Sequence, residues 1–117
     1  MPNFMLILHD DPSAFSGDIT PAQMQAVIAE YQAWAGKLAA AGALVGGEKL
    51  TDEGGKRMSL VAGKPRVVDG PYAEAKEVIG GYYTIQAESY DHAVELCADH
   101  PHLQYGARID IRQVHEL

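Results

Sequence analysis

The densest run of chemically useful side chains lies between residues 69 and 83. A turn sequence, Asp69-Gly70-Pro71-Tyr72, is followed at once by Glu74, Lys76 and Glu77, and then by Gly80-Gly81-Tyr82-Tyr83. One interpretation is a tight turn with a solvated charged loop, because Asp-Gly-Pro is good turn chemistry by itself. In the other, the three charges reach into a cleft beside a sheet, where they adjust one another's pKa values and orient a polar ligand.

His9 is the strongest single candidate for acid–base chemistry. It ends an apolar segment and is followed by Asp10 and Asp11, either of which is placed to orient its ring. Ends of strands next to loops are common places for sites. The alternative is a surface histidine among acidic loop residues. A metal site made of these three neighbours is disfavoured, because adjacent side chains on a strand diverge.

Arg108, Asp110 and Arg112 alternate along the last predicted strand and therefore share one of its faces. If that face is buried, the three charges must pair, and an ion-pair ladder at an interface is one interpretation. The other is a pocket in which Arg108 or Arg112 faces an anionic substrate. Tyr82 and Tyr72 would then supply its aromatic wall.

The other reactive residue types indicate no metal, cofactor or nucleophile. His100-Pro101-His102 has a short metal-ligand spacing, but the sequence offers no third ligand beside it. Cys97 falls on the inner stripe of a predicted helix, where a buried thiol is usually inert. Trp34 lies beside a helix stripe and is expected to pack. We therefore predict neither a bound metal nor a cofactor.

Length and charge limit the possible partners. The chain has 117 residues, which predicts one domain over residues 1–117. Nine scattered basic residues against 16 acidic ones give a net charge of -7, which disfavours nucleic acid and anionic membranes. No apolar segment approaches the roughly 20 residues that cross a bilayer. The single cysteine, with no signal-peptide pattern, predicts a cytoplasmic location.

The periodicity of apolar residues predicts two helices and six strands. Thr20 is placed to cap the first helix, with Gln23 completing a capping box and Gly42 ending it. The second helix begins after Ser89 and stops before Pro101. The strands are expected at residues 3–9, 43–50, 57–62, 66–69, 79–87 and 107–114, with Gly63-Lys64-Pro65 connecting a hairpin.

This order of elements predicts an α+β fold, a ferredoxin-like sandwich with two helices on one face of a mainly antiparallel sheet. The first strand is apolar on both faces, yet the helices cover only one. Tyr82 lies on the uncovered side. We therefore predict a homodimer in which two sheets pack against each other. The stripes facing the sheet are expected to be Met24, Val27, Ile28, Tyr31, Ala35 and Leu38 in the first helix, and Ala93, Val94 and Cys97 in the second.

Four stretches carry a resemblance to a known family. They are the run from Asp69 to Tyr83, Phe4–Ile7, Ala40–Leu44 and Tyr105–Arg112, which together extend over nearly the whole chain. They are similar to the DGPF branch of the YCII-related proteins. The resemblance implies a dimeric α+β barrel of ferredoxin-like subunits, and a functional link to an alternative sigma factor.

Some relatives are implicated in cofactor-free chemistry on small aromatic or lactone-like compounds, with a histidine early in the first helix and an aspartate near the end of the second. Here Gln23 stands at the histidine's place, and Asp99 or His100 near the aspartate's. Glutamine does not titrate near neutral pH and cannot be a general base. Two functions stay open: a regulatory or ligand-binding dimer for a small polar or anionic molecule, or a cofactor-free isomerase, lyase or hydrolase.

Overall fold

The computed structural model describes residues 1–10, 20–51, 55–70 and 78–116. Both predicted helices and all six predicted strands are present, with ends shifted by a few residues. None of the described helices combines the length and the hydropathy needed to cross a membrane. The elements are β1 (Asn3–Asp10), α1 (Pro21–Ala40), β2 (Leu44–Lys49), β3 (Lys56–Val61), β4 (Lys64–Asp69), β5 (Val78–Gln86), α2 (Tyr90–Cys97), α3 (Pro101–Gln104) and β6 (Arg108–Gln113).

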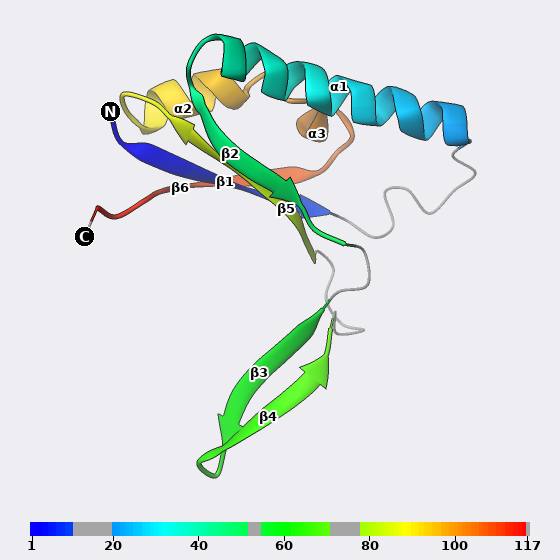
Figure 1. Cartoon of the computed structure of the whole chain (residues 1–117), viewed down its shortest axis with the longest axis vertical. Helices are drawn as coiled ribbons and strands as arrows, with labels where there is room; N and C mark the ends of the chain where they lie inside the picture. The colour runs from blue at the N-terminus through cyan, green and yellow to red at the C-terminus, as the bar shows by residue number, and fades with distance from the viewer. Residues whose placement is uncertain (11–19, 52–54, 71–77, 117) are drawn as a thin grey trace.

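Four strands form the main sheet in the order β2-β5-β1-β6, and every neighbouring pair is antiparallel. The three helices lie together on one side of this sheet (Figure 1). The predicted α+β, ferredoxin-like arrangement is therefore confirmed. We call the side under the helices the helix face. The opposite side is the outer face, formed by Met5, Ile7 and His9 of β1, Tyr82 and Thr84 of β5, and Arg108, Asp110 and Arg112 of β6.

The core lies between the helix face and the helices. Phe4, Leu6 and Leu8 of β1 are buried there, whereas their odd-numbered neighbours are only half-buried on the outer face. Trp34 and Leu38 of α1 complete the middle of the core. Because side chains alternate along β1, its last two residues, His9 and Asp10, lie on opposite faces of the sheet.

The first half of α1 extends beyond the sheet. The predicted cap is present, since Thr20 accepts a hydrogen bond from the Gln23 backbone and the Gln23 side chain accepts one from the Thr20 backbone. The helix is followed by Gly42 at a φ of 74°. However, Met24 and Ile28 are 38% and 48% exposed, so the predicted stripe is buried only over the second half of the helix.

The segment after Ser89 differs from the sequence prediction in two ways. Ser89 caps α2 as expected, but Val94 is 55% exposed and does not join the inner stripe. A third helix, α3, begins at Pro101, where the sequence predicted only an end. Proline is well suited to the first position of a helix because its missing N–H is not needed there. Over the described residues, the helix face therefore carries three helices instead of the two predicted.

β3 and β4 form a separate two-stranded sheet that projects away from the main sheet (Figure 1). Val61 pairs with Lys64, so the connection is only Ala62 and Gly63. Both have positive φ values, 53° and 78°, which is the geometry of a two-residue hairpin turn. The predicted connection through Lys64 and Pro65 is wrong, because both residues already belong to β4.

The burial pattern makes a prediction about stability. Replacing the fully buried Leu6 by alanine should lower the free energy of unfolding by about 2–5 kcal/mol, because a cavity remains in the core. Val94→Ala, at an exposed position, should change it by no more than about 0.5 kcal/mol. Urea unfolding followed by circular dichroism measures both. Equal losses at the two positions would contradict the assignment of these side chains to core and surface.

Candidate functional site

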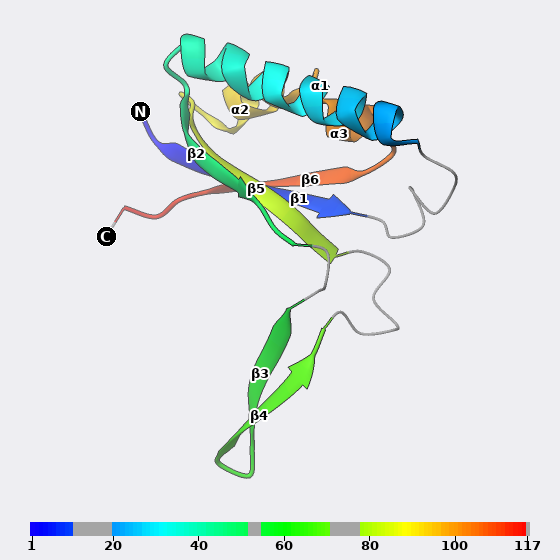
Figure 2. The ribbon, with the colours of Figure 1, turned by 45° about the vertical axis from the view of Figure 1, so that its right-hand side comes forward.

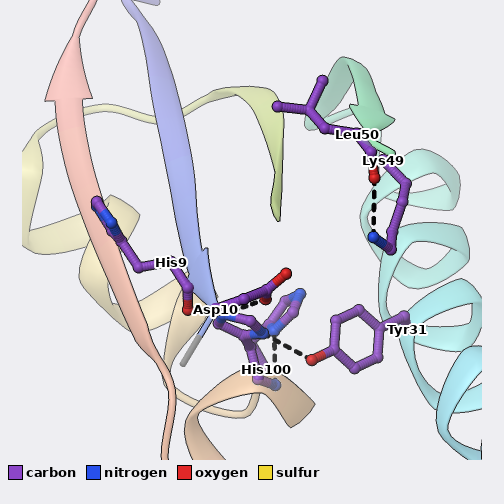
Figure 3. Close-up of polar contacts among 7 residues, drawn as sticks. His9, Asp10, Tyr31, Lys49, Leu50 and His100 are labelled. Atoms are coloured by element: carbon purple, nitrogen blue, oxygen red, sulfur yellow. Dashed lines mark hydrogen bonds and ion pairs between the residues drawn. The ribbon is translucent and has the colours of Figure 1, made fainter. Parts of the chain in front are cut away.

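Four polar side chains meet on the helix face at the end of β1. Asp10 comes from β1, Tyr31 from α1, and His100 and His102 from the start of α3. Figure 3 shows Asp10, Tyr31 and His100 turned towards one another, with His9 directed away from them. Both imidazoles are almost completely buried, at 0% and 2% exposure. Buried polar groups of this kind require partners, and these partners define the site.

His102 joins three elements through its two ring nitrogens. Nε2 lies 2.7 Å from the backbone oxygen of His9, and Nδ1 lies 2.6 Å from the hydroxyl oxygen of Tyr31. A carbonyl oxygen can only accept, so Nε2 carries the hydrogen. In the neutral ring Nδ1 is then the acceptor, and the Tyr31 hydroxyl donates to it. The two hydrogen bonds fix the tautomer and the orientation of the ring.

Tyr31 is partly exposed to solvent, and its hydroxyl contacts the buried ring of His102. Burial raises the pKa of its hydroxyl, and the nearby negative charge of Asp10 raises it further. Tyr31 is therefore protonated at neutral pH, and its single hydrogen is the one donated to His102. Its oxygen keeps lone pairs that can accept a hydrogen bond from a ligand. A ligand proton could thus reach His102 through the tyrosine oxygen, which is a general-base arrangement.

Asp10 supplies the negative charge next to this pair. Its carboxylate Oδ1 lies 3.7 Å from His102 Nε2, close enough to stabilise a positive charge on the ring. The position depends on Gly80, which is skipped where the register between β1 and β5 shifts. A Cβ atom at Gly80 would lie 1.8 Å from Oδ2 of Asp10. Only glycine therefore leaves room for the carboxylate at this bulge.

His100 is a buried neutral ring. Its Nδ1 accepts a hydrogen bond from the His102 backbone at 2.9 Å, which caps α3. The rings of Trp34, Tyr31 and Tyr83 surround it, with centroids 4.4, 5.1 and 5.6 Å away. Burial lowers the pKa of His100 to about 4, helped by His102 and opposed by Asp99. Nε2 therefore keeps its hydrogen, and it has no hydrogen-bond partner among the described residues.

Lys49 brings a cation to the same side of the sheet. It ends β2, where its pairing with Gly81 places it on the helix face, and its ammonium group donates to the Leu50 carbonyl at 2.9 Å. A phenol, an imidazole and a carboxylate therefore meet between β1, α1 and α3, and a lysine lies on the same face of the sheet. Such a set can bind a polar ligand and exchange a proton with it.

The side chains of His102 and Asp99 are both paired within the protein. The ring nitrogens of His102 bind Tyr31 and His9, so the spacing that resembles a metal motif serves hydrogen bonding here. Asp99 accepts from the Trp34 indole at 3.2 Å and pairs with Lys37, which keeps the pKa of its carboxyl below the usual range. The predicted packing role of Trp34 is confirmed by its 4% exposure.

Cys97 is buried, as predicted for the inner stripe of α2. Burial raises the pKa of its thiol to about 11, and the negative charge of Asp99 contributes. The thiolate, which is the reactive form, is therefore scarce at neutral pH.

Three of the residues predicted from the sequence share the outer face. His9 Nε2 lies 2.9 Å from Oδ2 of Asp110, and Arg108 is the cross-strand neighbour of His9. Tyr82 faces the same way from β5, opposite Ile7. Asp10, one of the two predicted partners of His9, lies on the helix face instead, so the Asp10 alternative is wrong, whereas Asp11 lies outside the described residues. Asp110, 101 residues away, takes this role because β1 and β6 are paired.

The remaining predicted residues are not part of either group. Asp69 ends β4 on the projecting hairpin, where it is exposed and pairs with Lys56 at 2.6 Å. Tyr72, Glu74, Lys76 and Glu77 lie outside the described residues, as does Asp11. The segment that contains them rejoins the described chain at Val78, whose β-pair partner is Asp10.

Comparison with known proteins gives the chain its family. The model of the YCII-related domain matches residues 3–116, so the chain belongs to the YCII-related family. Among solved structures, a 5-chloro-2-hydroxyhydroquinone dehydrochlorinase from Burkholderia phenoliruptrix AC1100, in complex with 2,5-dihydroxybenzoquinone, has the same fold. The TM-score is 0.54 at 16% sequence identity, over 98% of this chain and 95% of that one. No curated protein matches in sequence.

The neutral state of His100 leads to a prediction about pH. Its pKa falls from 6.5 in the unfolded chain to about 4 in the folded one, so only the unfolded chain takes up the proton between these values. Stability should be fully present above pH 6.5 and should fall towards pH 4, by roughly 1–3 kcal/mol from this group. In His100→Phe, urea unfolding should show a smaller loss between pH 7 and pH 5.

An exposed histidine provides the control for this prediction. His115→Gln should keep the pH dependence of the wild-type protein. If His100→Phe and His115→Gln have the same dependence as the wild type, His100 is not a ring kept neutral by burial.

Proposed function

We propose that the protein is a small acid–base enzyme, independent of a cofactor, that acts on a small hydroxylated aromatic molecule at the Tyr31–His102 pair. The observation that carries the proposal is the 2.6 Å contact between the Tyr31 hydroxyl and Nδ1 of His102, with the Asp10 carboxylate 3.7 Å from the other ring nitrogen. The sequence alone does not distinguish catalysis from ligand binding without turnover, because it reveals no paired base and acid. This pair favours catalysis.

The proton transfer follows from the hydrogen bonds. A hydroxyl of the ligand gives its proton to the Tyr31 oxygen while Tyr31 gives its own proton to Nδ1 of His102. The imidazolium that forms is stabilised by Asp10 and by the His9 carbonyl. The ligand is left as an oxyanion, which Lys49 can approach from β2. The imidazolium passes this proton back through the Tyr31 oxygen, to the ligand in an isomerisation or to water when a chloride leaves with the electron pair of its C–Cl bond.

The aromatic nature of the ligand is supported by the surroundings of the pair. The His100 ring lies edge-on to Tyr31, and the rings of Trp34 and Tyr83 pack against His100. Aromatic surroundings of this kind favour a planar ligand. The dehydrochlorinase with the same fold binds a dihydroxylated quinone. We also retain Glu74, Lys76 and Glu77 as candidates for ligand contact, since their segment rejoins the chain opposite Asp10.

Binding without turnover is the alternative, and the position of Gln23 favours it. The Gln23 side chain completes the helix cap, so the start of α1 offers no titrating group at this position. A ligand-binding or regulatory role would use the same aromatic and polar surroundings. The two functions differ in whether Tyr31 is needed for a reaction or only for affinity.

We also infer that two copies of the chain pack through their outer faces. Met5 and Ile7 are only half-buried at the centre of the sheet, and Tyr82 lies beside Ile7. Stable dimers of this kind bury about 1,200–2,000 Å² in total. In such a dimer the His9–Asp110 pair would lie within the interface, and Arg108 and Tyr82 would border it.

Replacing Tyr31 tests the proposed catalytic pair. With 5-chloro-2-hydroxyhydroquinone as probe, chloride release by Tyr31→Phe should be slower by about 10²-fold or more in kcat/KM. Tyr105→Phe is the matched control, because it removes an exposed hydroxyl that binds Glu30 on the surface. It should retain wild-type activity. Calorimetry with 2,5-dihydroxybenzoquinone measures binding separately.

The outcomes separate the two functions. Binding of the quinone that weakens in Tyr31→Phe, without chloride release by any form, supports the ligand-binding alternative. Absence of quinone binding, or binding and turnover that Tyr31→Phe leaves unchanged, would rule out the Tyr31–His102 pair as the site.

Lys76→Ala tests the part of the sequence prediction that lies outside the described residues. If Lys76 contacts the ligand, the variant should bind 2,5-dihydroxybenzoquinone about tenfold more weakly while its melting temperature stays near the wild-type value. Differential scanning fluorimetry and calorimetry give the two quantities. A loss of stability as large as the loss of affinity would indicate a structural loop instead.

A further inference from the structure

The β3–β4 hairpin is almost entirely exposed. Every residue of β3 is exposed, and in β4 only Val68 is partly buried. A lone two-stranded hairpin is marginally stable in water at best. The radius of gyration is 16.3 Å, whereas a compact chain of this length has about 13 Å. The hairpin thus extends the molecule without being packed on the rest of it.

One face of the hairpin is apolar beyond its base, where Lys56 pairs with Asp69 on that face. In an antiparallel pair, directly opposed residues share a face. The pairing of Met58 with Val67 and of Leu60 with Pro65 therefore collects four apolar side chains on one side. Met58, Leu60 and Val67 are 68%, 72% and 51% exposed. The opposite face carries Arg57, Ser59, Val61, Lys64, Arg66 and Val68.

The hairpin projects on the side of the outer face. Figures 1 and 2 show it on the opposite side of the main sheet from the three helices. This is the side on which a second copy would lie in the proposed dimer. Six residues of strand extend about 20 Å, while packed sheets are about 10 Å apart. The hairpin is long enough to reach past the sheet of a copy docked there.

Charge favours the same occupant. The hairpin contains Lys56, Arg57, Lys64 and Arg66 but only one acidic residue, Asp69, which gives it a net charge of 4 − 1 = +3. The whole chain has -7, so the rest of the chain carries -7 − 3 = -10. A basic arm on an acidic protein is attracted to another copy of that protein. An anionic bilayer fits less well as the occupant. A flat bilayer surface would contact only one face of the hairpin, either the apolar face or the basic face.

We propose that the β3–β4 hairpin is an arm that clasps a second copy of this chain, with Met58, Leu60, Pro65 and Val67 packed against the partner subunit. The inference rests on the proposed homodimer and adds a second contact region to it. Two-fold symmetry makes the contact reciprocal, so each subunit holds the other. The hairpin is marginally stable on its own, and in the proposed dimer its apolar face becomes buried.

Charge substitutions on the two faces of the hairpin test the arm. Leu60→Glu should raise the dimer dissociation constant by about tenfold or more, because it places a charge in the apolar contact. Val61→Glu is the matched control on the other face and should change the constant by less than about threefold. Sedimentation velocity at a series of concentrations measures both. Circular dichroism shows whether each variant keeps the fold.

A second measurement locates the arm directly. A photoreactive amino acid at position 60 should form a crosslink between subunits on irradiation, and the same group at position 61 should form much less. This readout does not depend on how a charge affects folding.

The possible failures are distinguishable. A monomeric wild-type protein at micromolar concentration would overturn both the arm and the sheet-to-sheet dimer. If the wild-type protein is a dimer, but Leu60→Glu does not weaken it and position 60 forms no crosslink between subunits, the proposed arm is overturned and the sheet-to-sheet dimer is not. Leu60-dependent binding to anionic vesicles by a monomer would assign the hairpin to a membrane and contradict the proposal. None of these outcomes bears on Tyr31, which the chloride-release assay tests separately.

Discussion

Two imidazole rings lie almost fully out of water between the sheet and its helices, and the organisation of the site depends on how their nitrogens are paired. His102 satisfies one nitrogen with the His9 carbonyl and the other with the Tyr31 hydroxyl. These bonds hold α3 against β1 and α1, so the position of the short helix follows from the need to pair buried polar atoms. His100 supports the arrangement by capping α3 with its own ring.

The two faces of the sheet have different roles, and the change of direction along β1 separates them. His9 turns outwards to Asp110, and the next residue, Asp10, turns inwards to His102. The helix face therefore holds Asp10, Tyr31 and His102, to which we assign the proposed acid–base role. The outer face holds apolar residues with a polar border, which suits an interface. The β3–β4 hairpin extends on the side of the outer face (Figure 2). Its apolar residues therefore add to the apolar surface that we propose a second copy of the chain covers.

The sequence predicted the fold well because its signals are local. The cap at Thr20, the alternation in β1 and the cap at Ser89 each act over a few residues, and all three are present. The site was predicted less well because its members are far apart in sequence. The sequence places Tyr31 on the apolar stripe of the first helix and His102 in a two-histidine spacing that resembles a metal motif. Only the pairing of α1 with α3 brings them together, although an aromatic hydroxyl on an inner stripe was a usable signal.

The most direct test of the account is a crystal structure of the protein soaked with 2,5-dihydroxybenzoquinone. We predict a ring oxygen of the compound within hydrogen-bonding distance of the Tyr31 hydroxyl, on the helix face of the sheet. Density for the compound only on the outer face, beside His9 and Arg108, would contradict the assignment of the site to the Tyr31–His102 pair.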